Sequence, residues 1–106
     1  MNHYKLSDMQ GGWIVGNFAP TVIRSPDFEV AVKNYPAGAI EAAHHHKVAE
    51  EVTLIASGKA RMCGRVFGTG DIIHLAPGES TGFEALEPTI TVVVKRPSVP
   101  NDKYLD

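Results

Sequence analysis

The sequence predicts an all-β fold in which many short strands form a sandwich or a barrel. No window of a dozen residues keeps an apolar period of 3.6, so amphipathic helices are not expected. Instead, short runs rich in β-branched and aromatic residues follow one another along the chain. These runs lie too close together for strand–helix–strand units. Glycines separate them at points where tight turns favour positive φ angles, namely Gly38, Gly58, Gly64, Gly70 and Gly78.

Six runs are expected to form strands. Alternate side chains of a strand share one face, so Val30 and Val32 point the same way in the second run. Val92 and Val94 do the same in the last run. The tail, residues 96–106, carries two prolines and is expected to cross the surface as an extended arm. The six runs are WIVGNF (13–18), FEVAVKNY (28–35), EVTLIAS (51–57), KARMC (59–63), DIIHLA (71–76) and TITVVVKR (89–96).

Length and charge favour one domain, residues 1–106, with neither nucleic acid nor a membrane as partner. The formal net charge is −2 and the basic residues are scattered, so no basic stripe is expected. No stretch approaches the roughly 18 apolar residues of a membrane span. No apolar signal run opens the sequence, so a cytoplasmic location is expected. The one cysteine, Cys63, cannot form an intramolecular disulfide and is expected to be a small buried side chain.

The stretch AAHHHKVAEE, residues 42–51, has the residue types of a metal site. In an extended strand, His44 and His46 point to one face and His45 points to the other. A turn after His46 would bring Glu50 or Glu51 back beside them, and strand alternation favours Glu51. Two imidazoles and one carboxylate suit Fe(II) or Mn(II) and leave coordination positions open. The alternative is a solvated polar loop with no chemistry.

The spacing around this stretch resembles the first motif of the cupin family, G(X)5HXH(X)3,4E(X)6G. Gly38, His44, His46, Glu51 and Gly58 stand at its five fixed positions, and the last gap selects Glu51 over Glu50. The resemblance covers about residues 28–96. It implies a cupin-type double-stranded β-helix, or jelly-roll barrel. It also implies a divalent transition metal (Fe, Mn, Ni or Zn) held inside the barrel by His44, His46 and Glu51.

The second cupin motif, G(X)5PXG(X)2H(X)3N, is only partly present. Gly70 and Gly78 match it, but Ala76 stands in the proline position and Ala85 in the asparagine position. Thr81 stands where the family has its fourth ligand, a histidine, and a hydroxyl is a poor ligand for a transition metal. A site with three protein ligands and water at the remaining positions is therefore expected.

Three further residues are candidates for the fourth ligand or for the pocket: His74, Thr81 and Phe83. His74 lies on the expected strand at 71–76, and alternation does not decide its face because both faces carry apolar groups. Phe83 shares the face of Thr81 in the family register and is the aromatic candidate for a pocket wall. The other large aromatic side chains are expected in the core or at a dimer contact, namely Trp13, Phe18, Phe28 and Phe67.

Three functions fit these patterns. The first is a metal-dependent enzyme that acts on a small polar metabolite. The second is a non-catalytic domain that binds or senses a small ligand, and the third is a metal-free isomerase or epimerase of the sugar type. The fold does not choose among them. The family resemblance also implies a homodimer, formed through the N-terminal strand and the proline-rich tail.

Overall fold

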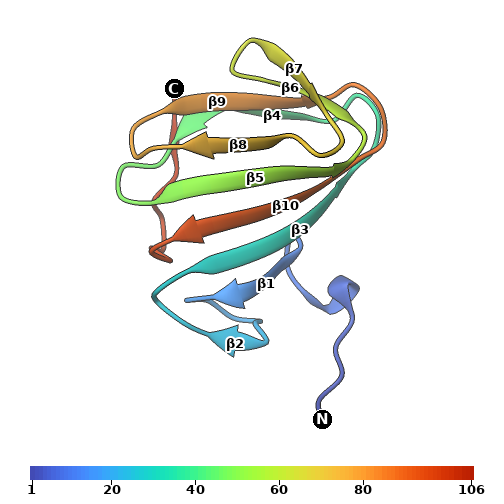
Figure 1. Ribbon diagram of the computed structural model, residues 1–106. Coiled ribbons are helices and arrows are strands. Elements are labelled where there is room, and N and C mark those ends of the chain that lie inside the picture. Colours follow the sequence, from blue (N-terminus) through green and yellow to red (C-terminus); the bar gives the residue numbers. More distant parts are fainter.

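The computed structural model describes residues 1–106 and confirms the all-β fold (Figure 1). A short 3₁₀ helix, η1 (Leu6–Asp8), precedes the strands and is the only helix. No helical segment has the length and apolar character that are needed to cross a bilayer. The strands are β1 (Trp13–Gly16), β2 (Ile23–Arg24), β3 (Glu29–Tyr35), β4 (Ile40–His45), β5 (Glu50–Ser57), β6 (Lys59–Met62), β7 (Arg65–Gly68), β8 (Ile72–Leu75), β9 (Ser80–Ala85), β10 (Thr89–Arg96) and β11 (Tyr104–Leu105).

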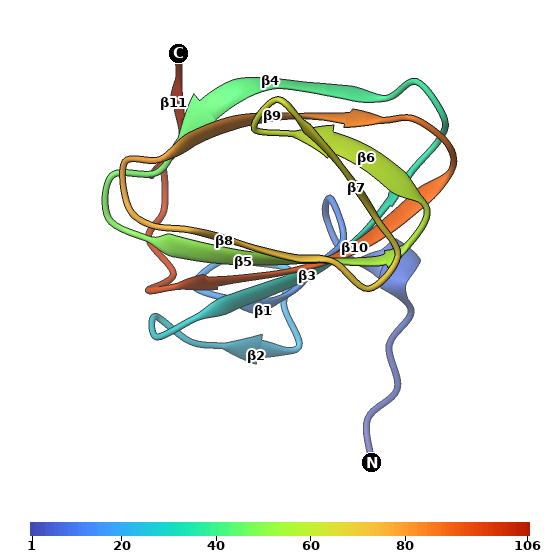
Figure 2. The same ribbon diagram turned by 45° about the horizontal axis from the view of Figure 1, so that its top comes forward.

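The strands form two sheets that face each other as the walls of a flattened barrel (Figure 2). The larger sheet has the order β2-β1-β3-β10-β5-β8, and the smaller sheet has the order β11-β4-β9-β6-β7. The long central strands β3, β10 and β5 are antiparallel neighbours. Consecutive strands mostly lie in different sheets, which is the connectivity expected of a jelly roll.

The apolar core fills one part of the space between the two sheets. Ile55 of β5 and Ala60 of β6 are fully buried there, beside Phe83 and Ala85 of β9. Met62, Ile73 and Leu75 complete the cluster. Alternate residues of β5 and β9 form the inward faces, because Thr53 and Ile55 on one strand and Phe83 and Ala85 on the other are all buried.

The hairpin between β6 and β7 corrects one expectation. Cys63 and Gly64 form its two-residue turn, with φ angles of 51° and 71°. Positive φ at both turn positions matches the right-handed twist of the flanking strands. Cys63 is consequently exposed at the tip of the hairpin and is not the buried side chain that was predicted.

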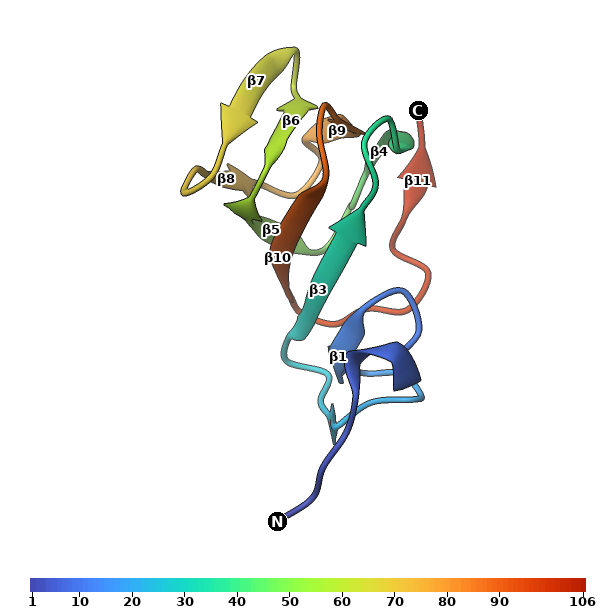
Figure 3. The ribbon, with the colours of Figure 1, turned by 90° about the vertical axis from the view of Figure 1, so that its right-hand side faces the viewer.

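The tail after β10 does cross the surface, but it then joins the barrel. Ser98 and Asp102 are buried along this segment, and the Ser98 N–H donates to the carbonyl of Pro26. Its last strand, β11, pairs with β4 so that Tyr104 lies opposite His45 (Figure 3). We call residues 97–106 the C-terminal arm. The arm passes from the larger sheet to the smaller one and closes one end of the barrel.

Candidate functional site

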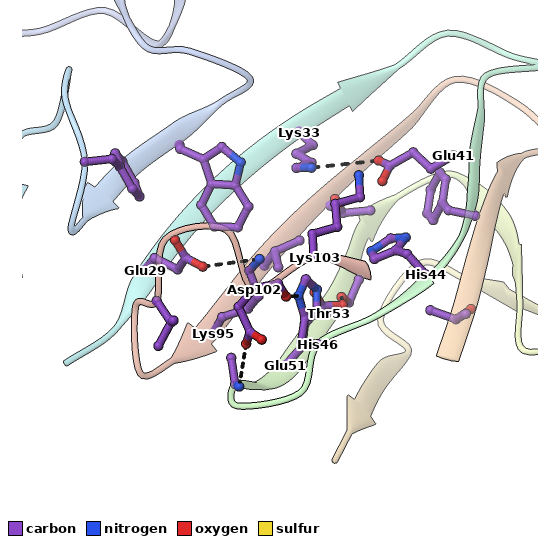
Figure 4. Close-up of a pocket in the computed structure, with 18 of the residues that line it drawn as sticks. Glu29, Lys33, Glu41, His44, His46, Glu51, Thr53, Lys95, Asp102 and Lys103 are labelled. Carbon is purple, nitrogen blue, oxygen red and sulfur yellow. Dashed lines mark hydrogen bonds and ion pairs between the residues drawn. The ribbon is translucent and has the colours of Figure 1, made fainter. Parts of the chain in front are cut away.

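A cavity of about 360 Å³ lies between the two sheets, next to the apolar core (Figure 4). Its walls come from β3, β5 and β10 of the larger sheet, from β4 and β9 of the smaller sheet, and from the C-terminal arm. The volume lies in the range typical of sites for small molecules. His44, His46 and Glu51 all line it.

His46 is held in one orientation by the C-terminal arm. It follows β4 directly and is buried, and its Nδ1–H donates to the carbonyl oxygen of Asp102 over 2.5 Å. A carbonyl only accepts hydrogen bonds, so the proton of the neutral ring sits on Nδ1 and Nε2 keeps its lone pair. That Nε2 lies 3.6 Å from Oε1 of Glu51. A histidine that ligates a metal usually has this arrangement, in which a backbone or carboxylate oxygen fixes the far nitrogen.

The carboxylate of Asp102 holds the loop that follows β4. It accepts hydrogen bonds from the backbone N–H groups of Lys47, Val48 and Ala49. Burial alone would raise the pKa of Asp102, but these three donors and the nearby His46 hold the pKa below its usual value. Asp102 thus fixes His46 through its carbonyl and the loop through its side chain.

Glu51 points into the cavity from β5, as strand alternation predicted. Its Oε2 accepts a hydrogen bond of 3.1 Å from the hydroxyl of Thr53. Burial would raise the pKa of Glu51, but the His46 ring, which donates to the carboxylate when Nε2 also carries a proton, lowers it together with the Lys95 ammonium group and the Thr53 hydroxyl. The carboxylate is therefore ionised at neutral pH, which is the state that a metal requires of its ligand.

His44 lies across the cavity from Glu51, on β4. Its Nδ1 donates to the carbonyl oxygen of Ala42 over 2.9 Å, which leaves Nε2 free. The rings of His44 and His46 meet edge to face, with centroids 5.3 Å apart. No three His, Cys, Asp or Glu side chains converge closely enough to form a finished metal site.

The donor set nevertheless fits a divalent metal. Both histidines use Nδ1 for a backbone carbonyl and keep Nε2 free, and the nearby carboxylate is ionised. Ligand atoms that are each about 2.1 Å from one ion lie roughly 3 to 3.4 Å apart, and the 3.6 Å between His46 and Glu51 is only slightly longer.

The neighbouring polar residues lie outside this cavity. His45 pairs with Asp106, with 2.6 Å between Nδ1 and Oδ1, on the outer side of β4. Glu50 points away from Glu51 and pairs with His74 over 3.0 Å. The side chain of His74 is 57% exposed, so its face is the outer one and it does not replace the missing fourth ligand. β5 begins at Glu50, one residue before the strand predicted at 51–57.

Thr81 and Phe83 both line the cavity from β9. The Thr81 hydroxyl donates to the carbonyl of Gly82 over 2.6 Å and accepts from the N–H of Cys63 over 3.0 Å. These two bonds use the proton and one of the two lone pairs of the hydroxyl and hold it on the backbone of Gly82 and Cys63. Phe83 packs against the ring of Tyr35, with centroids 4.4 Å apart, and forms part of the cavity wall.

Solved structures with the same fold include enzymes and proteins without an assigned activity. A protein with a double-stranded β-helix domain from Klebsiella pneumoniae is 29% identical, with a TM-score of 0.68 over 76% of this chain and 71% of its own. An RmlC-like cupin from Shewanella frigidimarina, 18% identical, has a TM-score of 0.63 over 73% of this chain and 71% of its own. The chain therefore shares the cupin-type double-stranded β-helix fold with these structures.

A third similar structure is an enzyme. Oxalate decarboxylase from Bacillus subtilis is 25% identical and has a TM-score of 0.65. The match covers 76% of this chain but only 24% of the decarboxylase chain. A further structure of that decarboxylase concerns its Mn(II) centres. Neither a protein-family model nor a curated protein sequence matches this chain.

The pocket also contains a hydrogen-bonded pair, Tyr35 and Glu41, that the sequence analysis did not predict. The hydroxyl of Tyr35 on β3 donates a short hydrogen bond to Oε1 of Glu41 on β4, and Lys33 lies 3.8 Å from the same oxygen. Alternation places Glu41 opposite His44, because the two are three residues apart. A β-bulge between them restores a common face, since Glu41 pairs with Phe83 while His44 pairs with Thr81.

Trp13 and Phe18 line the same pocket and are not confined to a core or a dimer contact as predicted. The ammonium groups of Lys33 and Lys95 lie 5.3 Å and 4.8 Å from the centre of the Trp13 ring. Lys95 also pairs with Glu29 over 3.2 Å. The predicted strand at 13–18 gave no sign of this position, because β1 reaches the pocket only by pairing with β3.

Proposed function

We propose that this protein binds a divalent transition metal through His44, His46 and Glu51 and acts on a small polar molecule held beside it. The observation that supports the proposal most directly is the His46 imidazole, whose Nε2 is free and faces the ionised Glu51. Such an ion acts as a Lewis acid toward oxygen atoms of a bound molecule. The metals that suit this donor set are Fe, Mn, Ni and Zn.

The remaining residues position these ligands and shape the pocket. The Asp102 carbonyl fixes the tautomer of His46, and the Thr53 hydroxyl holds one oxygen of Glu51. Phe83 and Tyr35 form an apolar wall, which excludes water from one side of the bound molecule. The Glu41 carboxylate is the one acid–base group of the pocket outside the proposed ligand set whose second oxygen has no hydrogen-bond partner.

Metal analysis of the untagged protein tests the proposal. After loading with Mn, Fe, Ni or Zn and removal of free ion, we expect close to one equivalent of metal per chain. His44→Ala, His46→Ala and Glu51→Gln each remove a ligand and should abolish retention. His45→Ala and Glu50→Gln are the matched controls, because their side chains point outward. Less than about a tenth of an equivalent after loading would reject the metal site.

Thr81 favours a second candidate, a non-catalytic domain that binds or senses a small ligand. Thr81 stands where the cupin motif has its fourth ligand, a histidine, and its hydroxyl already bonds to two backbone groups. Metal-loaded protein that binds polar metabolites without converting any of them would support this candidate. A metal-free isomerase, in which the His46–Glu51 pair transfers protons, is favoured instead if turnover survives complete removal of metal.

A further inference from the structure

The charged side chains that line the pocket are nearly all paired with one another. Glu29 pairs with Lys95 over 3.2 Å, and Glu41 lies 3.8 Å from Lys33. Asp102 accepts three backbone N–H groups, and Glu51 faces His46. The exception is Lys103 of the C-terminal arm, which lines the pocket and has no carboxylate within 4.0 Å of its ammonium group.

Lys103 is placed by the residue before it. Asp102 is anchored to the loop after β4, so the backbone of the arm is fixed where Lys103 begins. Figure 4 shows the Lys103 side chain reaching into the pocket beside His44, on the side toward Lys33 and Glu41. A free ammonium group thus faces the same space as the proposed ligands.

With a divalent metal bound, the net charge of the pocket favours an anionic ligand. Four carboxylates and three ammonium groups line it, so it carries one net negative charge without a metal. A divalent cation on His44, His46 and Glu51 would change that net charge to positive. An anion that carries one negative charge would then restore neutrality, and Lys103 is the unpaired cation available to it.

We propose that the pocket recognises a small hydroxycarboxylate whose carboxylate pairs with Lys103 and whose hydroxyl donates to Glu41. This inference rests on the proposed function, because the other end of the molecule would lie at the metal. Oε1 of Glu41 is engaged by Tyr35 and Lys33, whereas Oε2 has no hydrogen-bond partner and is free to accept one. A carboxylate with hydroxyl groups satisfies both free groups.

Phosphate fits this pocket less well than a carboxylate. Proteins commonly hold phosphate with forked arginines or with the N-terminus of a helix, which supply several donors at once. No arginine lines the pocket, and no helix ends at it. One ammonium group matches the single charge of a carboxylate.

Matched pairs of acids and alcohols test the inference. The probes are gluconate against sorbitol and glycerate against glycerol, with inorganic phosphate as a third ligand, added to metal-loaded protein after free ion has been removed. Binding is measured by calorimetry and by the fluorescence of Trp13, the only tryptophan, which lies in the pocket wall. We expect at least one acid to bind about tenfold more tightly than its alcohol, since a hydrogen bond to a charged group has this strength.

Variants of Lys103 decide which group causes the preference. Lys103→Met should lower the affinity for the acid about tenfold and leave that for the alcohol unchanged, whereas Lys103→Arg should restore the preference. Lys47→Met is the matched control, because Lys47 lies nearby over the ring of Tyr104 but does not line the pocket.

The outcomes separate this inference from the proposed function. Metal retention together with equal affinity for acids and alcohols, or with a preference that survives Lys103→Met, overturns the role of Lys103 alone. Phosphate that binds more tightly than either acid overturns the assignment of a carboxylate. Failure of the wild-type protein to retain any metal overturns the proposed function instead.

Discussion

At the scale of single residues, Tyr35 has the largest pKa shift in the pocket. Its ring packs against Phe83, and its hydroxyl donates to Glu41. Burial is the main cause that raises the pKa of Tyr35 far above its usual value, and the hydrogen bond and the negative charge of Glu41 raise it further. The hydroxyl therefore stays protonated throughout the neutral and moderately alkaline range.

An alkaline titration of phenolate absorbance tests this protonation. The chain has three tyrosines, and the two others, Tyr4 and Tyr104, are exposed. We expect Tyr35 to contribute phenolate absorbance only when the protein unfolds at alkaline pH. Because the pKa is raised in the folded state, this contribution to stability is complete below about pH 10 and is lost as the pH rises further. Tyr35→Phe should remove the absorbance step that accompanies unfolding, and phenolate absorbance from Tyr35 in the folded wild-type protein would contradict its burial.

At the scale of elements, the C-terminal arm and the loop after β4 form one unit through Asp102. Asp102→Asn removes the charge that accepts the N–H groups of residues 47–49 but leaves the carbonyl bond to His46. Charge-assisted hydrogen bonds contribute about 1.5–3 kcal/mol each, so we expect a loss of roughly that size in the free energy of unfolding. Metal affinity should fall about tenfold, because the loop carries His46.

Asp106→Asn is the control for the arm. Asp106 accepts from His45 and Ser80 on the outer side of the barrel, where solvent weakens the interaction. Chemical denaturation and metal titration should both show a smaller effect than that of Asp102→Asn. Equal effects of the two variants would mean that the arm acts only as a surface strand.

The bulge in β4 predicts a second effect at this scale. Gly82 lies opposite it on β9, and an added Cβ would stand 3.2 Å from the carbonyl oxygen of Glu41, which is too close for ordinary contact. We expect Gly82→Ala to lower the free energy of unfolding by about 1–3 kcal/mol. Gly68→Ala is the matched control, because its added Cβ meets nothing closer than 3.8 Å. Equal stabilities of the two variants in urea would contradict a tight bulge.

At the scale of the whole molecule, the outer face of the larger sheet lies uncovered. Val94 of β10 stands between Val30 of β3 and Val52 of β5, and both Val94 and Val52 are 38% exposed. The segments expected to form the dimer are used inside the chain, since β1 pairs with β3 and the arm pairs with β4. The apolar face is a further surface that a second copy could cover.

We propose that two copies of the chain pack back to back through this face. The charged residues Glu50 and Arg96 lie side by side at its rim, and such a mixture of signs suits an interface that repeats itself about a two-fold axis. Val94→Asp should convert a dimer into a monomer in sedimentation velocity. Val66→Asp, on an exposed valine of the smaller sheet, should leave the mass unchanged. A wild-type monomer at micromolar concentration would reject this interface.

Much of this arrangement follows from local rules. The period of two along a strand predicts that Glu51, Thr53 and Ile55 share the inward face and that His45 points away, and the structure agrees. The same rule fails at Glu41, because the bulge opposite Gly82 adds one residue to β4. Gly82 is the residue whose small size indicates the bulge, but it does so only once β9 is known to pair with β4.

The sequence by itself determined the all-β class and six of the eleven strands, because alternation and turn chemistry depend only on near neighbours. Only the tertiary structure decided that His74 faces outward, since both faces of its strand are apolar. It alone also brought Asp102 to residues more than fifty positions earlier in the chain. Contacts between such distant segments depend on how the whole barrel closes, and local sequence patterns do not predict that closure.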